Sequence, residues 1–190
     1  MSARRFYFYA LLLILLNCAL PFTASTKQSP ITATVLPGPD HDAFQRILSA
    51  LPPRFQKNQE EWRVGEYDQS HWYLATRSLG CMNESNAEGW TLYNSRWILI
   101  RENAENSTTA IFWHEIGHAF VWPCLTSKER RCWESLYRQE TKSGKYASCY
   151  AGKDSEEGFA ETLRLSQTNP TALKAFPAEH FYFSLLLPAS

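Results

Sequence analysis

Residues 107–121 read STTAIFWHEIGHAFV, an apolar stretch that encloses a small group of reactive side chains. Ser107 or Thr108 can cap the amino-terminal end of a helix, and Pro123 follows just beyond its other end. We therefore predict a buried helix over residues 108–121. Its apolar positions surround three polar residues, which are His114, Glu115 and His118.

The pattern His-Glu-x-x-His places two imidazoles on one side of this helix. His114 and His118 are four positions apart, so they project from one face on successive turns. Two such side chains can bind one Zn²⁺ at nitrogen–metal distances of about 2.1 Å. Glu115 lies beside that face and can accept a proton from water without binding the metal. Because burying these groups without partners would be costly, the motif predicts a zinc hydrolase.

A catalytic zinc site needs a third protein ligand and one open position. The metzincin arrangement would require a glycine and a histidine shortly after His118. Val121 and Cys124 occupy those two positions, so this arrangement is absent.

A later helix, predicted over residues 155–167, supplies the missing ligand. Asp154 can cap this helix, and Glu157 and Glu161 are four positions apart on one of its faces. We expect Glu157 to bind the metal and Glu161 to accept a hydrogen bond from a ligand imidazole. Glu156 is the other possible ligand, but its face carries no second acid one turn further on.

A tyrosine in the loop before this helix completes the set of candidates. Tyr150 precedes Glu157 by seven residues, and its phenol can donate a hydrogen bond to an oxyanion. H-E-x-x-H followed by Y-A-x5-E-x-F-A-E, at residues 150–161, resembles the anthrax lethal factor-like metallopeptidases. The layout is similar to that of the secreted Pro-Pro endopeptidases, and the resemblance covers residues 90–167.

The resemblance implies an α+β, gluzincin-like domain in which a small mixed sheet lies over the H-E-x-x-H helix. It implies one Zn²⁺ held by His114, His118 and Glu157. It assigns Glu115 as the general base and Tyr150 as the hydrogen-bond donor to the oxyanion. It assigns Glu161 as the partner of a ligand imidazole. It also implies a peptide substrate that pairs with an edge strand, expected at Trp97–Arg101. The expected substrate contacts are Trp97, Ile98, Leu99 and Glu156.

The amino terminus has the features of a secretory signal peptide over residues 1–25. Arg4 and Arg5 precede an apolar run over residues 6–16, which is too short for a stable membrane span. Removing this segment takes two of the 19 basic residues and none of the 19 acidic ones, which leaves 17 against 19. That balance argues against a nucleic-acid partner. We expect a secreted monomer with a flexible lead-in over residues 26–40 and one catalytic domain over residues 41–190.

The cysteines of the mature chain indicate disulfides, because their number is even and the protein is predicted to be secreted. Four cysteines allow three pairings, of which we prefer Cys124–Cys132 with Cys81–Cys149. These cysteines are a departure from the bacterial enzymes of the resemblance. Asn83 and Asn106 begin N-glycosylation sequons.

Periodicity predicts the remaining elements. Helices are expected over residues 40–51, capped by Asp40, and over residues 127–141. Strands are expected at residues 62–64, 72–75, 90–93 and 96–100, and the apolar run at residues 181–187 is expected in the core.

Composition and motif together predict a secreted zinc metalloendopeptidase that acts on a peptide or protein substrate. One alternative is a secreted binding or effector domain that keeps the fold with little or no turnover. Another is a zinc hydrolase that acts on something other than a peptide.

Overall fold

The computed structural model describes residues 33–56, 59–78, 87–102 and 106–187. Over these residues the chain is α+β, with six α-helices and one mixed four-stranded sheet. The predicted signal peptide, Cys81 and Asn83 lie outside the described residues. None of the helices in the described ranges is long and apolar enough to cross a membrane.

The sheet has the strand order β1-β2-β4-β3. Its strands are β1 (Thr34–Val35), β2 (Arg63–Tyr67), β3 (Gly89–Leu92) and β4 (Trp97–Arg101). β1 and β4 run parallel to β2 on its two sides, and β3 runs antiparallel to β4. β4 is therefore an inner strand, and Ile98 and Leu99 are fully buried. The expectation that Trp97–Arg101 is an edge strand is wrong, and β3 forms that edge.

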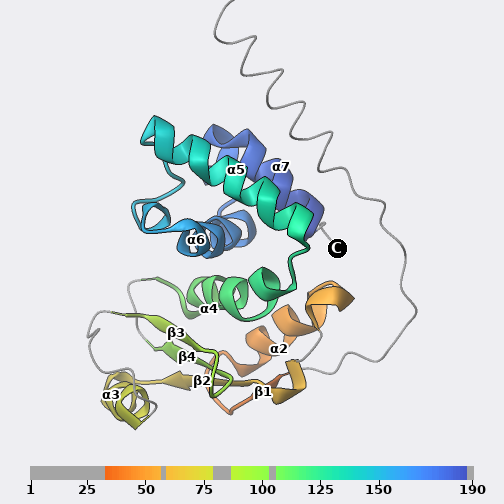
Figure 1. Cartoon of the computed structure of the whole chain (residues 1–190). Helices are drawn as coiled ribbons and strands as arrows, with labels where there is room; N and C mark the ends of the chain where they lie inside the picture. Colours follow the sequence, from red (N-terminus) through yellow and green to blue (C-terminus); the bar gives the residue numbers. More distant parts are fainter. Residues whose placement is uncertain (1–32, 57–58, 79–86, 103–105, 188–190) are drawn as a thin grey trace, which may run out of the picture.

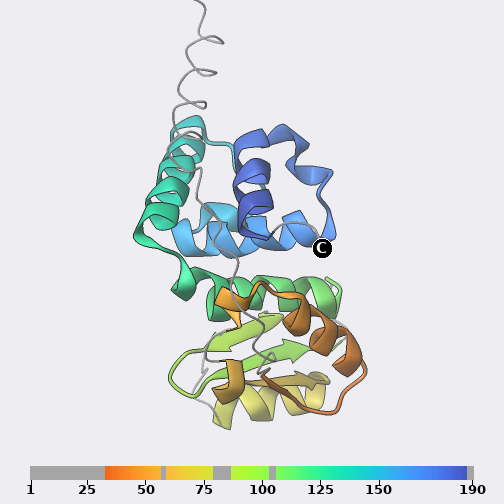
Figure 2. The ribbon, with the colours of Figure 1, turned by 90° about the vertical axis from the view of Figure 1, so that its right-hand side faces the viewer.

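Helix α4 (Thr108–Ile116) lies between the sheet and the other helical layer (Figure 1). That layer contains α5 (Ser127–Ser143), α6 (Ser155–Thr168) and α7 (Pro177–Leu186). Helix α2 (His41–Ala50) also packs against α4 and β1, whereas α3 (Gln69–Ser78) lies on the side of the sheet away from α4 (Figure 2). α4 therefore contacts both halves of the molecule.

The stretch at residues 72–75 is helical, not a strand as predicted. It lies inside α3, where Trp72 and Thr76 are buried one turn apart while Tyr73 and Leu74 are each 62% exposed. The Asp68 carboxylate accepts a hydrogen bond from the backbone N–H of His71 at 2.9 Å and so supports the start of the helix. Four apolar residues in a row do not distinguish the two periodicities, and burial of only one face favours the helix.

Residues 33–40, expected to be part of a flexible lead-in, instead begin the fold. Val35 is buried in β1, which pairs with β2. The backbone N–H of Asp40 donates to the Glu66 carboxylate at 3.0 Å. The Asp40 side chain does not cap α2 and instead accepts a hydrogen bond from the Thr108 hydroxyl at the start of α4.

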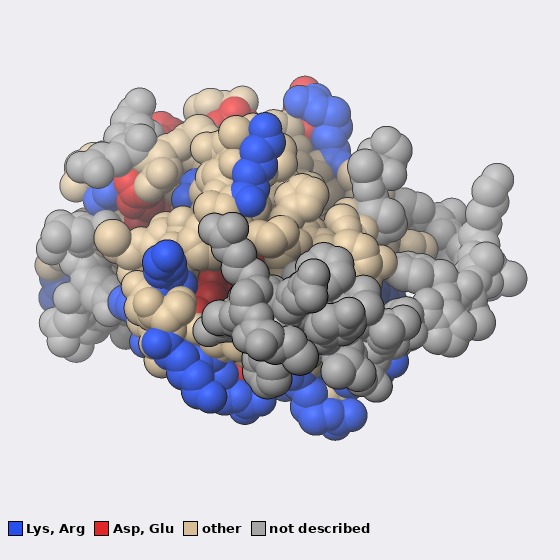
Figure 3. Space-filling view, turned by 90° about the horizontal axis from the view of Figure 1, so that it is seen from above, with Lys and Arg blue, Asp and Glu red and all other residues tan. Residues whose placement is uncertain are grey.

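Aromatic side chains fill the interior of the layer formed by α5, α6 and α7. Trp133 of α5 makes edge-to-face contacts with Phe159 of α6 and Phe183 of α7. The indole N–H of Trp133 also donates to the Ser155 carbonyl at 2.7 Å, which ties α5 to the first residue of α6. Of the apolar run at residues 181–187, Tyr182, Phe183, Leu186 and Leu187 are buried, as predicted, whereas Phe181 is 40% exposed. On the face in Figure 3, Lys and Arg side chains lie in separate places among other residues.

The preferred disulfide pairing is wrong. Cys149 is a free thiol, and Cys124 and Cys132 are not bonded to each other. Cys132 is disulfide-bonded and lies on the buried face of α5, whereas Cys124 ends a half-buried turn before that helix.

Candidate metal centre

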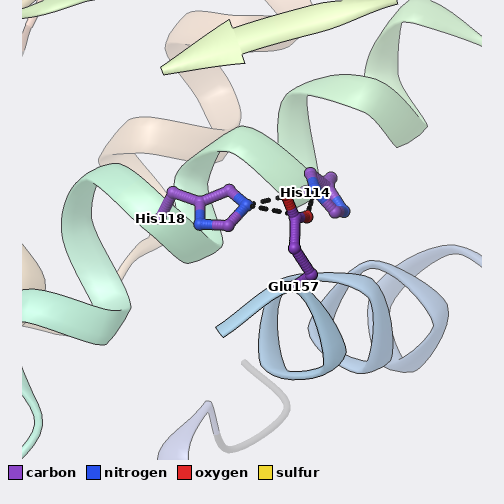
Figure 4. A group of neighbouring side chains, drawn as sticks. All are labelled: His114, His118 and Glu157. Carbon is purple, nitrogen blue, oxygen red and sulfur yellow. Dashed lines mark hydrogen bonds and ion pairs between the residues drawn. The ribbon is translucent and has the colours of Figure 1, made fainter. Parts of the chain in front are cut away.

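Two small residues let α4 and α6 approach closely. A Cβ atom added to Gly117 would lie 2.9 Å from Cα of Ala160 and 3.0 Å from its Cβ. No larger side chain fits at Gly117 unless the helices separate. The close approach places the first turn of α6 opposite His114 of α4 and His118 of the turn that follows α4, as Figure 4 shows.

Three donor atoms converge between these helices. Nε2 of His114 and Nε2 of His118 are 3.2 Å apart, and Oε2 of Glu157 lies 3.1 Å from the first and 3.3 Å from the second. Donors around a tetrahedral zinc at about 2.1 Å would be separated by about 3.4 Å. The three groups could therefore hold a metal ion, and two imidazoles with one carboxylate are a donor set suited to zinc.

His118 does not lie in regular α-helix. α4 ends at Ile116, and Gly117–Val121 forms one π-helical turn. The predicted helix over residues 108–121 is thus present as an α-helix followed by a π turn. Such turns occur often at functional sites, and the sequence pattern carries no signal for one.

A carboxylate and a guanidinium lie behind His114. Oε2 of Glu161 is 3.5 Å from Nδ1 of His114, and Arg164 donates two hydrogen bonds of 2.7 Å to the Glu161 carboxylate. Burial acts to raise the pKa of Glu161, but Arg164 and His114 outweigh it and lower the pKa to about 2. Sequence reasoning missed Arg164, although its position three residues after an acid on a helix is a usable signal.

Glu156 contacts Nδ1 of His118, which is the ring nitrogen that faces away from His114 and Glu157. Its Oε1 is 3.1 Å from Nδ1 of His118 and accepts a hydrogen bond of 2.6 Å from the hydroxyl of Tyr93. Glu156 is therefore beside the donor cluster of His114, His118 and Glu157 without being part of it. Tyr93 was not predicted, because it comes from the turn after β3 and no local pattern marks it.

Glu115 is held by the edge strand. The hydroxyl of Thr91 donates to Oε2 of Glu115 at 2.6 Å, and the Glu115 side chain is buried. A Cβ atom on Gly89 would lie 2.5 Å from Oε1 of Glu115 and 2.6 Å from Ile111. Gly89 thus leaves the space that the carboxylate occupies. Thr91 was not singled out from the sequence.

A cavity of about 340 Å³ opens onto these groups. Its walls include Glu115, the three candidate ligands, the edge strand and Tyr150. The Tyr150 ring is 5.5 Å from that of His114, and Lys153 lies 3.3 Å from the Tyr150 hydroxyl. Burial and the nearby Glu157 raise the pKa of Tyr150, and Lys153 offsets this only in part. The phenol therefore stays protonated and able to donate at neutral pH.

The electrostatics of the cluster favour a positive charge at its centre. Burial alone would lower the pKa of His118, but hydrogen bonds to Glu156 and Glu157 raise it to about 10. Burial likewise opposes the rise in the pKa of His114, which Glu157 and Glu161 produce. The two imidazoles hold the pKa of Glu157 far below its ordinary value, although burial opposes this. A divalent cation would satisfy the same carboxylate without the added protons.

The structure thus brings together the expected groups from three separate segments, which are His114, Glu115, His118, Tyr150, Glu157 and Glu161. The expected substrate contacts Trp97, Ile98 and Leu99 do not line the cavity, since β4 is covered by β3. Comparisons of the chain with protein-family models, with curated proteins and with solved structures found no match.

Proposed function

We propose that this protein is a secreted zinc-dependent endopeptidase that hydrolyses peptide bonds with Glu115 as general base. The observation that carries the proposal is the convergence of His114, His118 and Glu157 at separations suited to tetrahedral zinc. Glu115 and Tyr150 line the same cavity as these donors. The resemblance to lethal factor-like metallopeptidases supports the same assignment.

Each group has a chemical task in this proposal. When bound, Zn²⁺ would polarise the substrate carbonyl and make water more acidic. Glu115 takes a proton from the attacking water and passes it to the leaving amine. The hydrogen bond from Thr91 holds one carboxylate oxygen, and the other, which lies beside Gly89, is the one that takes the proton. Tyr150 donates a hydrogen bond from its hydroxyl to the oxyanion that forms on the substrate.

The edge strand supports a peptide substrate. β3 pairs with β4 on one side, and Gly89, Trp90 and Thr91 line the cavity. An extended peptide can add to such an edge through backbone hydrogen bonds, which supply affinity without a fixed sequence. β3 takes this role in place of Trp97–Arg101.

The test uses the secreted protein, its zinc content and a peptide library read by mass spectrometry. We expect one equivalent of zinc, cleavage of internal peptide bonds, and loss of cleavage when a chelator removes the metal. Glu115→Gln is expected to retain zinc while cleaving about 10³-fold more slowly.

Two results would contradict the proposal. Cleavage by Glu115→Gln at the wild-type rate would exclude the general-base mechanism. Zinc binding without hydrolysis of any library peptide would favour a binding or effector domain, and added ester and amide substrates would reveal a hydrolase of another class.

A further inference from the structure

Both candidate histidine ligands have a carboxylate against the nitrogen that faces away from the donor cluster. Nδ1 of His114 faces Glu161, whose other partner is Arg164 on the same helix. Nδ1 of His118 faces Glu156, whose other partner is Tyr93. The two arrangements are alike in chemistry, but the second joins three separate elements: the π turn after α4, the first turn of α6 and the turn after β3.

The second arrangement is held at both ends. Asp154 accepts hydrogen bonds of 2.9 Å from the backbone N–H groups of Glu156 and Glu157, which fixes the start of α6. The Tyr93 hydroxyl lies 2.6 Å from Glu156 and 3.4 Å from the backbone carbonyl of His118. The Glu156 carboxylate is thus held between a phenol and an imidazole.

An imidazole that binds a metal through Nε2 must carry its proton on Nδ1. A carboxylate opposite Nδ1 selects that tautomer, fixes the ring and makes Nε2 a better donor. His118 depends on this help because it lies in a π turn rather than in regular helix. Its Nε2 must nevertheless be held close to that of His114 and to Glu157.

We propose that Glu156 and Tyr93 are positioning residues for His118, acting as a relay in which Tyr93 orients Glu156 and Glu156 orients the imidazole. This proposal rests on the metal site of the proposed function. Glu156 also lines the cavity, so the expectation that it contacts substrate stays a prediction beside this role. The relay also links the turn that ends the edge strand to the metal ligand.

The test measures Zn²⁺ affinity of the full secreted protein by competition with a chromophoric chelator. Glu156→Gln is expected to weaken zinc binding by about 10- to 100-fold, the range found when a partner of a metal ligand is removed. Tyr93→Phe removes no charge and is expected to weaken binding by about 3-fold, since its shorter hydrogen bond is to Glu156 and its contact with the His118 carbonyl is long. The double variant is expected to match Glu156→Gln alone, because the relay is then already broken.

Two matched variants control for substitution itself. Glu134→Gln changes a carboxylate that also contacts the start of α6, through Ser155, without touching His118. Tyr73→Phe removes a hydroxyl on the exposed side of α3. Both are expected to bind zinc as the wild type does. Thermal unfolding of the metal-free variants is the measurement that checks whether each of them folds.

A spectroscopic measurement separates positioning from simple charge loss. In the Co²⁺-substituted wild type, the Nδ1 protons of His114 and His118 should each give a solvent-exchangeable, shifted proton signal. Glu156→Gln and Tyr93→Phe should broaden or shift the signal of His118 and leave that of His114 in place.

The outcomes distinguish the relay from the proposed function. If the wild type binds zinc and both variants bind it equally well, with both signals unchanged, the relay is wrong while the metal site stands. If additive losses appear in the double variant, Tyr93 acts independently of Glu156 and the relay is also wrong. If the wild type binds no zinc, the proposed function itself fails.

Discussion

Glu115 depends on residues that lie far from it in the sequence. Its carboxylate accepts a hydrogen bond from Thr91 on the edge strand. Gly89, two residues earlier and on the same face of β3, leaves room for the other oxygen. The candidate base is thus positioned by the strand on which we expect the substrate to bind.

Thr91→Val tests this contact. The substitution keeps the shape of the side chain and removes the hydroxyl, so the Glu115 carboxylate is no longer held against β3. We expect cleavage to slow by about 10-fold with unchanged zinc content, since small displacements of a catalytic group are costly. Steady-state rates on a library-derived peptide provide the measurement. Thr141→Val, which removes an exposed hydroxyl on α5, is the control, and equal rates for both variants would count against the role of Thr91.

At the scale of elements, the helices were predicted better than the strands. Ser107 caps α4 and Asp154 caps α6, as their positions indicated. Caps and helical periodicity are local, so a single segment carries the signal. The strand at residues 72–75 was wrong, and the edge position of Trp97–Arg101 was wrong, because pairing depends on segments distant in sequence.

The contact between α4 and α6 is the element pair on which the candidate site depends. Gly117→Ala would place a methyl group within 3.0 Å of Ala160, so the helices must separate. We expect the free energy of unfolding of the metal-free protein to decrease by about 1–3 kcal/mol, the usual cost of overpacking. Zinc affinity should decrease as well, because Glu157 moves away from the histidines.

Urea unfolding and chelator competition measure these two effects separately. A variant that is destabilised but binds zinc with wild-type affinity would show that the donor cluster tolerates a shift of α6. The structure predicts instead that a shift of α6 lowers the zinc affinity of the donor cluster.

At the scale of the whole molecule, two buried acids interact unfavourably in the layer formed by α5, α6 and α7. Glu140 of α5 and Glu179 of α7 are both buried, and the carboxylate oxygens of Glu140 have no hydrogen-bond partner within the described part of the chain. Burial, with a further contribution from Glu179, raises the pKa of Glu140 from 4.5 to about 8. At a pH between these two values, Glu140 therefore keeps its proton in the folded protein and releases it in the unfolded chain.

This pKa predicts how stability depends on pH. Between about pH 4.5 and 8, Glu140 holds its proton in the folded state and loses it in the unfolded state, so its contribution to the free energy of unfolding falls as pH rises through this window. Glu140→Gln removes the titrating group and is expected to stabilise the metal-free protein at pH 8.5 by up to about 5 kcal/mol, with little effect at pH 4.5.

Urea unfolding of wild type and variant at several pH values checks this expectation. Thr141→Val on the same helix serves as the control, because it removes no titratable group, and its difference from wild type should not depend on pH. A pH-independent difference for Glu140→Gln would mean that folding does not change the pKa of Glu140.

The sequence alone determined the donor types and the helices that carry them. His114, Glu115, His118, Glu157 and Glu161 were found because each group lies within one or two helical turns, where spacing sets the shared face. Only the tertiary structure decided which strand forms the edge, which cysteines are not bonded to each other, and that Thr91 and Tyr93 reach the site. Those contacts join segments far apart in the chain, and packing rather than local periodicity selects them.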